Sequence, residues 1–202
     1  MSSFLDLPAD LSQRLEKQSQ AGTRREARER GPHQDRFRIA AVLLPLIWRH
    51  EHWQLIYTLR SSMLHDHSGQ VSFPGGSWEE SDKSIIETAL RESWEEIGLD
   101  PEIVRVLGKM ADVEMITGFR ITPVVGICEW PTRLTVNPDE VDRVFSIPID
   151  WLADKRNRYY REHDHQGVDF EVLYFKPYDG ETVWGVTAMI TLDFLKLLDI
   201  KV

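Results

Sequence analysis

The segment from Lys83 to Gly98 constrains the fold most, because it has helical periodicity and stands between stretches typical of β-strands. Its residues KSIIETALRESWEEI include many strong helix formers, and Gly98 followed by Pro101 is a typical helix end. We expect Asp82 or Ser81 to cap its start. A helix with strands before and after it in the chain predicts a mixed α/β layered domain.

Three carboxylates share one side of this predicted helix. At about 100° per residue, Glu92, Glu95 and Glu96 fall within one arc. Like charges four residues apart, in the last turn of a helix, are destabilising by roughly 0.2–1 kcal/mol each. Arg91 can pair with Glu95 and with Glu87, which relieves only part of this repulsion. A solvated acidic face is one interpretation, and a divalent cation such as Mg²⁺ or Mn²⁺ held by carboxylate oxygens is the other.

The opposite side of the helix is expected to pack against a sheet. It carries Ile86, Leu90, Ser93, Trp94 and Ile97. The stretch just before the helix has a proline and two glycines, Pro74 to Gly76, and is expected to be a loop whose backbone can approach a ligand closely.

Other elements follow from local patterns. RIAAVLLPLIW and WQLIYTLR predict a β-hairpin, and ITPVVGIC and FEVLYFKP predict further strands. Residues 149–154 are expected to form a short helix and residues 185–198 a C-terminal helix. Residues 1–36 are polar and predict a helical and linker extension, so the folded domain is expected over residues 37–202.

Charge and composition exclude several classes of protein. A net charge of -9 argues against nucleic-acid binding, which needs clustered Lys and Arg. The chain has no apolar run long enough to span a membrane and no apolar block near its start, so we expect a cytoplasmic protein with a small-molecule partner. Its single cysteine, Cys128, lies in an apolar run and is interpreted as a buried hydrophobic residue.

Residues 76–99, GSWEESDKSIIETALRESWEEIGL, closely resemble the Nudix box, which ends in REuxEExGu with u apolar. Arg91, Glu92, Glu95 and Glu96 match the second half, with Gly98 and Leu99. The sequence departs from the box at three places: Lys83 stands where the box has its first glutamate, Gly76 lies one residue too far upstream, and Ser93 occupies an apolar position.

The preceding stretch, LIYTLRSSMLHDHSGQVSFPGG, resembles the additional signature of the coenzyme A (CoA) pyrophosphatase branch. That branch tends to carry a loop one residue longer with an aspartate before the helix, and Asp82 fits this pattern. The matching residues are Arg60, Ser61, Leu64, His67, Gly69, Gln70, Val71, Phe73, Pro74, Gly75 and Gly76.

The resemblance implies the Nudix α/β/α sandwich with a mixed sheet. It also implies hydrolysis of CoA or acyl-CoA to 3',5'-ADP and (acyl-)4'-phosphopantetheine, with Mg²⁺ or Mn²⁺ activating the attacking water. The implied metal ligands are Glu92, Glu95 and Glu96, with Arg91 orienting them. For substrate, the resemblance points to the residues Arg60, Ser61, His67, Gln70, Gly75 and Gly76, with support of the loop as the alternative role.

Glu140 is a further candidate, because Nudix proteins often bring an acidic residue outside the box over the site. It can take the proton of the attacking water or complete the metal shell, and a capping or solvated acid is the alternative. Asp139 can take the role instead. Two other functions remain open, a Nudix hydrolase of another nucleoside diphosphate such as ADP-ribose, and a non-hydrolysing nucleotide sensor. The sequence leaves the oligomeric state, the phosphorus attacked and the preferred form of CoA open.

Overall fold

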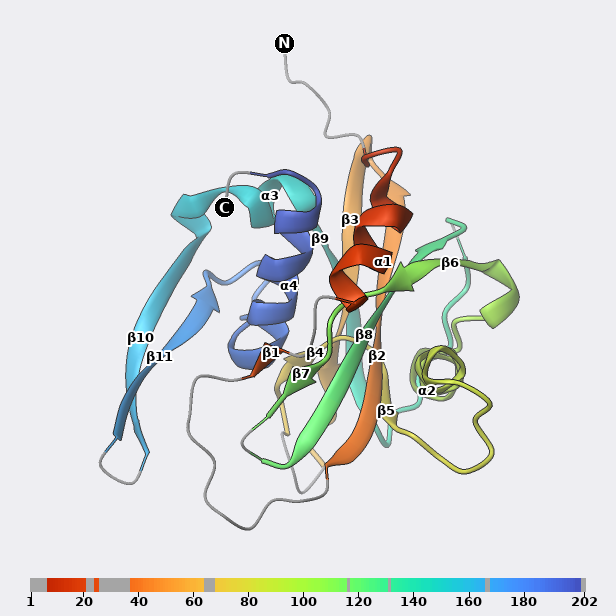
Figure 1. The fold of residues 1–202 in the computed structure, drawn as a ribbon, viewed down its shortest axis with the longest axis horizontal. Coiled ribbons are helices and arrows are strands. Elements are labelled where there is room, and N and C mark those ends of the chain that lie inside the picture. Colours follow the sequence, from red (N-terminus) through yellow and green to blue (C-terminus); the bar gives the residue numbers. More distant parts are fainter. Residues whose placement is uncertain are drawn as a thin grey trace. The chain divides into compact units, whose positions relative to one another are not determined.

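A computed structural model describes most of the chain (Figure 1). The described residues are 7–20, 24–25, 37–63, 68–115, 117–130, 132–165 and 168–200. They form two compact units, each described below by itself. The box unit comprises Ala9–Ile47 and Pro74–Asn137, and the C-terminal unit comprises Met1–Pro8, Trp48–Phe73 and Pro138–Val202.

The box unit is built on a mixed set of strands. Strand β2 (Arg38–Arg49) runs parallel to β8 (Phe119–Cys128), and β5 (Gly75–Ser77) pairs antiparallel with β2. Strands β6 (Val104–Lys109) and β7 (Val113–Glu114) are antiparallel to β8, and β1 (Arg24–Arg25) is parallel to β7. Parallel pairing buries both faces of a strand, which explains the nearly continuous apolar run of β2.

Two helices belong to this unit. Helix α1 (Leu11–Gln20) packs against β6, where Leu15 is fully buried beside Gly108. Helix α2 (Ile85–Ile97) is followed by a short 3₁₀ helix, Pro101–Ile103. The helix expected in the N-terminal extension is therefore present and packed on the domain, while the boundary at residue 37 stays a prediction.

The C-terminal unit contains three paired strands and two helices. Strand β3 (His52–Arg60) pairs antiparallel with β9 (Val141–Pro148) and with β4 (Val71–Ser72). Helices α3 (Ile149–Ala153) and α4 (Gly185–Leu197) occur where the sequence predicted helices, with a 3₁₀ turn at Lys155–Asn157 between α3 and the next strand. Tyr57 is fully buried, and its hydroxyl lies 3.0 Å from the Thr191 hydroxyl of α4.

A separate hairpin completes this unit. Strands β10 (Arg158–His165) and β11 (Val168–Phe175) form a long two-stranded ribbon (Figure 1). On one face the rings of Tyr159 and Tyr174 stack, and Trp184 stacks on Tyr174. On the other face acidic residues oppose acidic residues: the pairs are Glu162 with Glu171 and Asp164 with Asp169.

Several local expectations about α2 were wrong. Its N-cap is Ser84, whose hydroxyl accepts a hydrogen bond from the Glu87 amide, rather than Asp82 or Ser81. Trp94 is 53% exposed although it was expected in the buried stripe, and Glu96 is only 3% exposed although it was expected on the acidic face. Ile97 and Ser93 are buried as expected, and Gly98 ends the helix in the left-handed conformation.

The predicted loop at Pro74–Gly76 also differs from the structure. Gly75 and Gly76 are not loop residues, because they begin strand β5 and pair with Val42 and Ala41 of β2. Within the described ranges, no helix is long and apolar enough to cross a membrane.

Candidate active site

Two carboxylates of α2 converge on strand β5. The Gly75 amide donates a hydrogen bond to Glu96 Oε2 at 3.1 Å. At Gly76, a Cβ atom would lie 2.4 Å from Glu92 Oε2 and 2.6 Å from its Oε1, so the Glu92 carboxylate occupies the space that any other side chain would fill. The two glycines therefore let the backbone reach the carboxylates of Glu92 and Glu96 directly.

A second, steric constraint requires glycine at position 75. Its φ is +153°, and a Cβ there would lie 2.3 Å from the carbonyl oxygen of Ala41. The preceding residue, Pro74, accepts a hydrogen bond from the Leu43 amide at 2.8 Å. Strand β2 thus holds the glycine strand at a distance that only a residue without Cβ allows.

Arg91 connects this strand to the helix. Its Nε and Nη2 donate to the Asp82 carboxylate at 2.9 and 3.1 Å, and Nη2 also donates to the Ser77 carbonyl at 3.0 Å. Its Nη1 donates to Glu95 Oε2 at 2.9 Å, and Nη2 lies 3.1 Å from Glu92 Oε1. One guanidinium group therefore fixes the end of β5, the loop before α2 and two box glutamates.

Asp82 anchors the loop between β5 and α2. Besides Arg91, it accepts hydrogen bonds from the Thr88 hydroxyl at 2.9 Å and from the Glu79 amide at 3.0 Å. The hydrogen bonds from Arg91 outweigh the effect of burial and lower the pKa of Asp82 to about 2. Asp82 therefore supplies the loop-fixing carboxylate that Lys83 cannot supply.

Ser93 occupies an apolar position of the box without an energetic conflict. It is fully buried, and its hydroxyl donates to the Ala89 carbonyl, one turn earlier, at 2.6 Å. A buried hydroxyl that bonds within its own helix avoids the cost of an unsatisfied polar group.

Of the signature residues upstream of the box, Arg60, Ser61 and Gln70 lie in the C-terminal unit, together with Glu140. The Ser61 amide donates to the Glu140 carbonyl at 2.8 Å, and the Arg60 amide donates to the Gln70 carbonyl at 3.0 Å. Arg60 is also opposite Val141 in the pairing of β3 with β9. The fold thus brings Glu140 beside the segment that carries Arg60, Ser61 and Gln70.

Comparison with known proteins decides the family. The model of the NUDIX domain matches residues 37–168. The chain is 44% identical over 153 residues to the uncharacterized Nudix hydrolase NudL of Pectobacterium atrosepticum, covering 76% of this chain and 79% of that protein. It is 38% identical over 170 residues to NudL of Enterobacter sp. strain 638, covering 81% and 84%. The chain belongs to the Nudix hydrolase family.

The fold agrees with this assignment. A MutT/nudix family protein from Enterococcus faecalis superimposes with a TM-score of 0.54 at 16% identity, over 85% of this chain and 66% of that one. The Nudix α/β fold with a mixed sheet is confirmed. As a Nudix hydrolase, the protein has pyrophosphatase activity on nucleoside diphosphate derivatives, and enzymes of this family generally need divalent metal ions.

The Nudix glutamates suit a divalent cation by their chemistry. Carboxylate oxygens are the ligands that Mg²⁺ and Mn²⁺ prefer, and Glu92 and Glu96 both meet the Gly75–Gly76 backbone. In the described part of the chain, no three His, Cys, Asp or Glu side chains are grouped closely enough to hold a metal ion. Glu95 is instead directed to Arg91, so a cation that uses Glu92 and Glu95 must compete with this guanidinium.

The other predicted site residues have varied surroundings. Ser61 is only 1% exposed, and its hydroxyl accepts from the Met63 amide, which indicates a role in shaping the loop. Gln70 and Glu140 are partly exposed, whereas His67 lies outside the described residues.

Glu87, expected to pair with Arg91, accepts a hydrogen bond from the Lys83 amide. Cys128 is buried, which raises the pKa of its thiol to about 12 and argues against a catalytic role.

The contribution of Ser77 was missed by sequence reasoning. It contributes its backbone carbonyl to Arg91, and a backbone acceptor leaves no mark in the residue type. The triple role of Asp82 was missed for another reason, since an aspartate just before a helix first suggests a cap. The sequence signal for this role of Asp82 was its position nine residues before Arg91.

Proposed function

We propose that this Nudix hydrolase cleaves the diphosphate bond of CoA or acyl-CoA, releasing 3',5'-ADP and (acyl-)4'-phosphopantetheine, with Mg²⁺ or Mn²⁺. The observation that carries the proposal is the convergence of Glu92 and Glu96 on the Gly75–Gly76 strand. The CoA assignment is supported by the signature from Leu55 to Gly76, which directly precedes the box.

In this proposal Glu92, Glu95 and Glu96 hold the metal ions. The ions supply positive charge to the diphosphate and lower the pKa of the attacking water. The Gly75 amide keeps one oxygen of Glu96 in place, which orients the second oxygen. Arg91 acts as a positioning residue, because its bonds to Asp82 and Ser77 fix the strand that faces the carboxylates.

We also propose roles for residues outside the box. Glu140 is proposed to accept the proton of the attacking water, since the box carboxylates are engaged as ligands. The fixed pairing of Arg60 with Gln70 and of Ser61 with Glu140 supports a common role for this cluster. Arg60 is the candidate for charge-assisted contact with the 3'-phosphate, and Gln70 and His67 are further candidates for contact with the substrate.

Two other functions are alternatives. A Nudix hydrolase of ADP-ribose or a similar nucleotide would use the same box with different substrate contacts. A nucleotide sensor without hydrolysis is disfavoured, because Glu92, Glu95 and Glu96 and their arginine partner are all present.

The metal role is tested with Glu96→Gln. We expect hydrolysis to require added Mg²⁺ or Mn²⁺ and the variant to lose at least about two orders of magnitude in rate, or about 2.7 kcal/mol. We also expect the cation to raise the melting temperature of the wild type and the variant to lose this stabilisation, because fewer carboxylates bind the cation. Glu102→Gln, which removes an exposed carboxylate outside the box, is the matched control and should keep both properties. Full turnover of the wild type in EDTA would refute the metal role.

The substrate is tested with a panel of CoA, acyl-CoA, dephospho-CoA, ADP-ribose, NADH and diadenosine polyphosphates, with products identified by mass spectrometry. We expect the highest kcat/KM for CoA or an acyl-CoA, with 3',5'-ADP as product. A tenfold preference needs only about 1.4 kcal/mol, which one charge-assisted contact can provide. If ADP-ribose or dephospho-CoA is preferred by that factor, the CoA assignment is wrong while the Nudix chemistry stands.

A further inference from the structure

An exposed indole ring follows the glycine strand of the active site. Trp78 comes directly after β5 and is 43% exposed. From its place on the strand we propose that Trp78 stacks on the adenine base of the nucleotide substrate and so contributes to substrate selection. The inference rests on the proposed function only in taking an adenine nucleotide as the substrate.

The direction of the Trp78 side chain follows from the geometry of the strand. A Cβ atom at Gly76 would lie 2.4 Å from Glu92 Oε2, so position 76 faces this carboxylate. The Trp78 amide donates to the Ile39 carbonyl at 2.9 Å, which extends the pairing of β5 with β2 by one residue. Because side chains alternate along a strand, Trp78 is on the same face as Gly76, about 7 Å farther along. A ribose separates an adenine base from its phosphates by a similar length.

The backbone on both sides of Trp78 is held by residues of the active site. The Ser77 carbonyl accepts a hydrogen bond from Arg91 at 3.0 Å, and the Glu79 amide donates one to Asp82 at 3.0 Å. Together with the bond from Trp78 to β2, these contacts anchor three consecutive residues. A ring on a fixed backbone loses little conformational freedom when a ligand binds, which favours affinity.

The surface beside the indole is apolar. Ile39 faces Trp78 in the antiparallel pairing, where opposite side chains are neighbours, and it is 37% exposed. Next to Ile39, the Arg120 guanidinium carbon lies 4.8 Å from the centre of the Phe37 ring, and its Nη2 donates to Glu114 at 2.8 Å. The charge at this border is therefore paired within the protein. The face of Trp78 and Ile39 suits a flat purine ring, which stacks on aromatic side chains.

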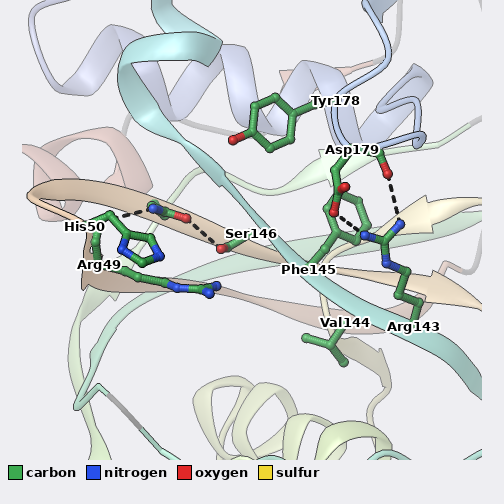
Figure 2. A pocket seen from close by; sticks show the side chains of 9 residues that line it. Arg49, His50, Arg143, Val144, Phe145, Ser146, Tyr178 and Asp179 are labelled. Carbon is green, nitrogen blue, oxygen red and sulfur yellow. Dashed lines mark hydrogen bonds and ion pairs between the residues drawn. The ribbon is translucent and has the colours of Figure 1, made fainter.

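A pocket in the C-terminal unit is less suited to a base. It has a volume of about 510 Å³ and is lined mainly by polar and charged residues (Figure 2). Arg143 is directed at Asp179, and Gln54 bonds to the Arg49 carbonyl and to the Ser146 hydroxyl. Because these groups are engaged with one another, the pocket points to no particular ligand.

The inference is tested with Trp78→Leu and Trp78→Phe, assayed with CoA and with ADP-ribose. We expect Trp78→Leu to raise KM at least about fivefold with kcat nearly unchanged, because stacking stabilises the bound substrate and the transition state equally. Trp78→Phe keeps a ring and should stay within about twofold of the wild type. The matched control is Trp94→Leu, which removes another exposed indole of the same unit, on the side of α2 opposite Glu92, and should leave KM unchanged.

Binding without turnover gives a second measurement. Calorimetric titration with 3',5'-ADP, which holds the base, should show weaker binding to Trp78→Leu by the same factor. Titration with 4'-phosphopantetheine, which lacks the base, should give the same affinity for Trp78→Leu and the wild type. If thermal melts show that Trp78→Leu does not fold, Ile39→Thr, which keeps a β-branched side chain beside the indole, should raise KM in the same direction.

The outcomes separate this inference from the proposed function. Unchanged KM and unchanged 3',5'-ADP affinity in Trp78→Leu overturn the stacking role, as does a wild type that binds no 3',5'-ADP. A loss confined to 4'-phosphopantetheine also overturns it, because the other end of the substrate would then contact Trp78. If ADP-ribose alone is hydrolysed and Trp78→Leu raises its KM, the CoA assignment fails and the stacking role stands. Hydrolysis of CoA with an unchanged KM in Trp78→Leu has the opposite meaning.

Discussion

Replacing Asp82 by Asn tests how much the loop anchor contributes to stability. The pKa of Asp82 falls from 3.8 to about 2 because Arg91, Thr88 and the Glu79 amide stabilise its charged form. A difference of roughly two pKa units corresponds to about 2.5 kcal/mol of stability when the group is ionised. Since Asp82 is only 7% exposed, solvent screens this interaction little. We expect Asp82→Asn to lower the free energy of unfolding by about 2.5 kcal/mol at pH 7.

The effect should depend on pH in a defined direction. A carboxylate with a lowered pKa stabilises the native state above its unfolded pKa, and this contribution is lost as the pH falls through the folded pKa. The window for Asp82 is therefore pH 4 to about pH 2. In urea denaturation we expect the difference between wild type and Asp82→Asn to be about half as large at pH 3 as at pH 7.

A surface aspartate provides the control. Arg156 lowers the pKa of Asp154 to about 2 as well, but Arg156 is largely exposed and its pairing is weakened by solvent. Asp154→Asn should therefore change stability much less than Asp82→Asn at pH 7. Equal stability of wild type and Asp82→Asn at pH 7 would refute the anchoring role. A loss that is the same at pH 3 and pH 7 would show that charge is not its cause.

Two further predictions concern the active site. Gly76→Ala should fold with little loss of stability but lose activity, because its Cβ displaces only the flexible Glu92 carboxylate. Gly75→Ala should be destabilised by about 1–3 kcal/mol, because its Cβ would clash with the backbone of β2. Thermal melts and rates measured on both variants check this, and an active Gly76→Ala would contradict it. Glu140→Gln should lower kcat at least tenfold and leave KM and the circular dichroism spectrum nearly unchanged, while Asp139→Asn should retain activity. A wild-type kcat in Glu140→Gln would assign Glu140 to a structural role and make Asp139 the next candidate.

Local signals in the sequence predicted several elements of the fold, whereas the strands β5, β6, β7 and β10 were not predicted. The helix after Lys83 ends at Gly98 as expected, because a glycine in the left-handed conformation is a local requirement of the helix end. The strands β2 and β3 and the helices α3 and α4 also follow from patterns within single segments. The same local reasoning predicted the site residues of the box, because they lie within two turns of one helix. These residues are Arg91, Glu92, Glu95 and Glu96.

The features that were mispredicted depend on contacts with other segments. Ser81, Asp82 and Ser84 are all capable caps, and Ser84 takes the role while Asp82 is engaged by Arg91 and Thr88. Helical periodicity placed Glu96 on the exposed side, but the Gly75 amide binds its carboxylate and makes its burial tolerable. The same contact depends on Gly75–Ser77 being a strand, and this strand forms only because β2 is available for pairing.

The hairpin of β10 and β11 carries an uneven distribution of stability along its length. Near its base the stacked rings of Tyr159 and Tyr174 hold the two strands together, while farther out Glu162 opposes Glu171 and Asp164 opposes Asp169. Like charges directly opposite each other repel, and dissolved salt screens that repulsion. Backbone amides of the outer half should thus exchange with deuterium faster than those at the base, and the contrast should diminish as ionic strength rises.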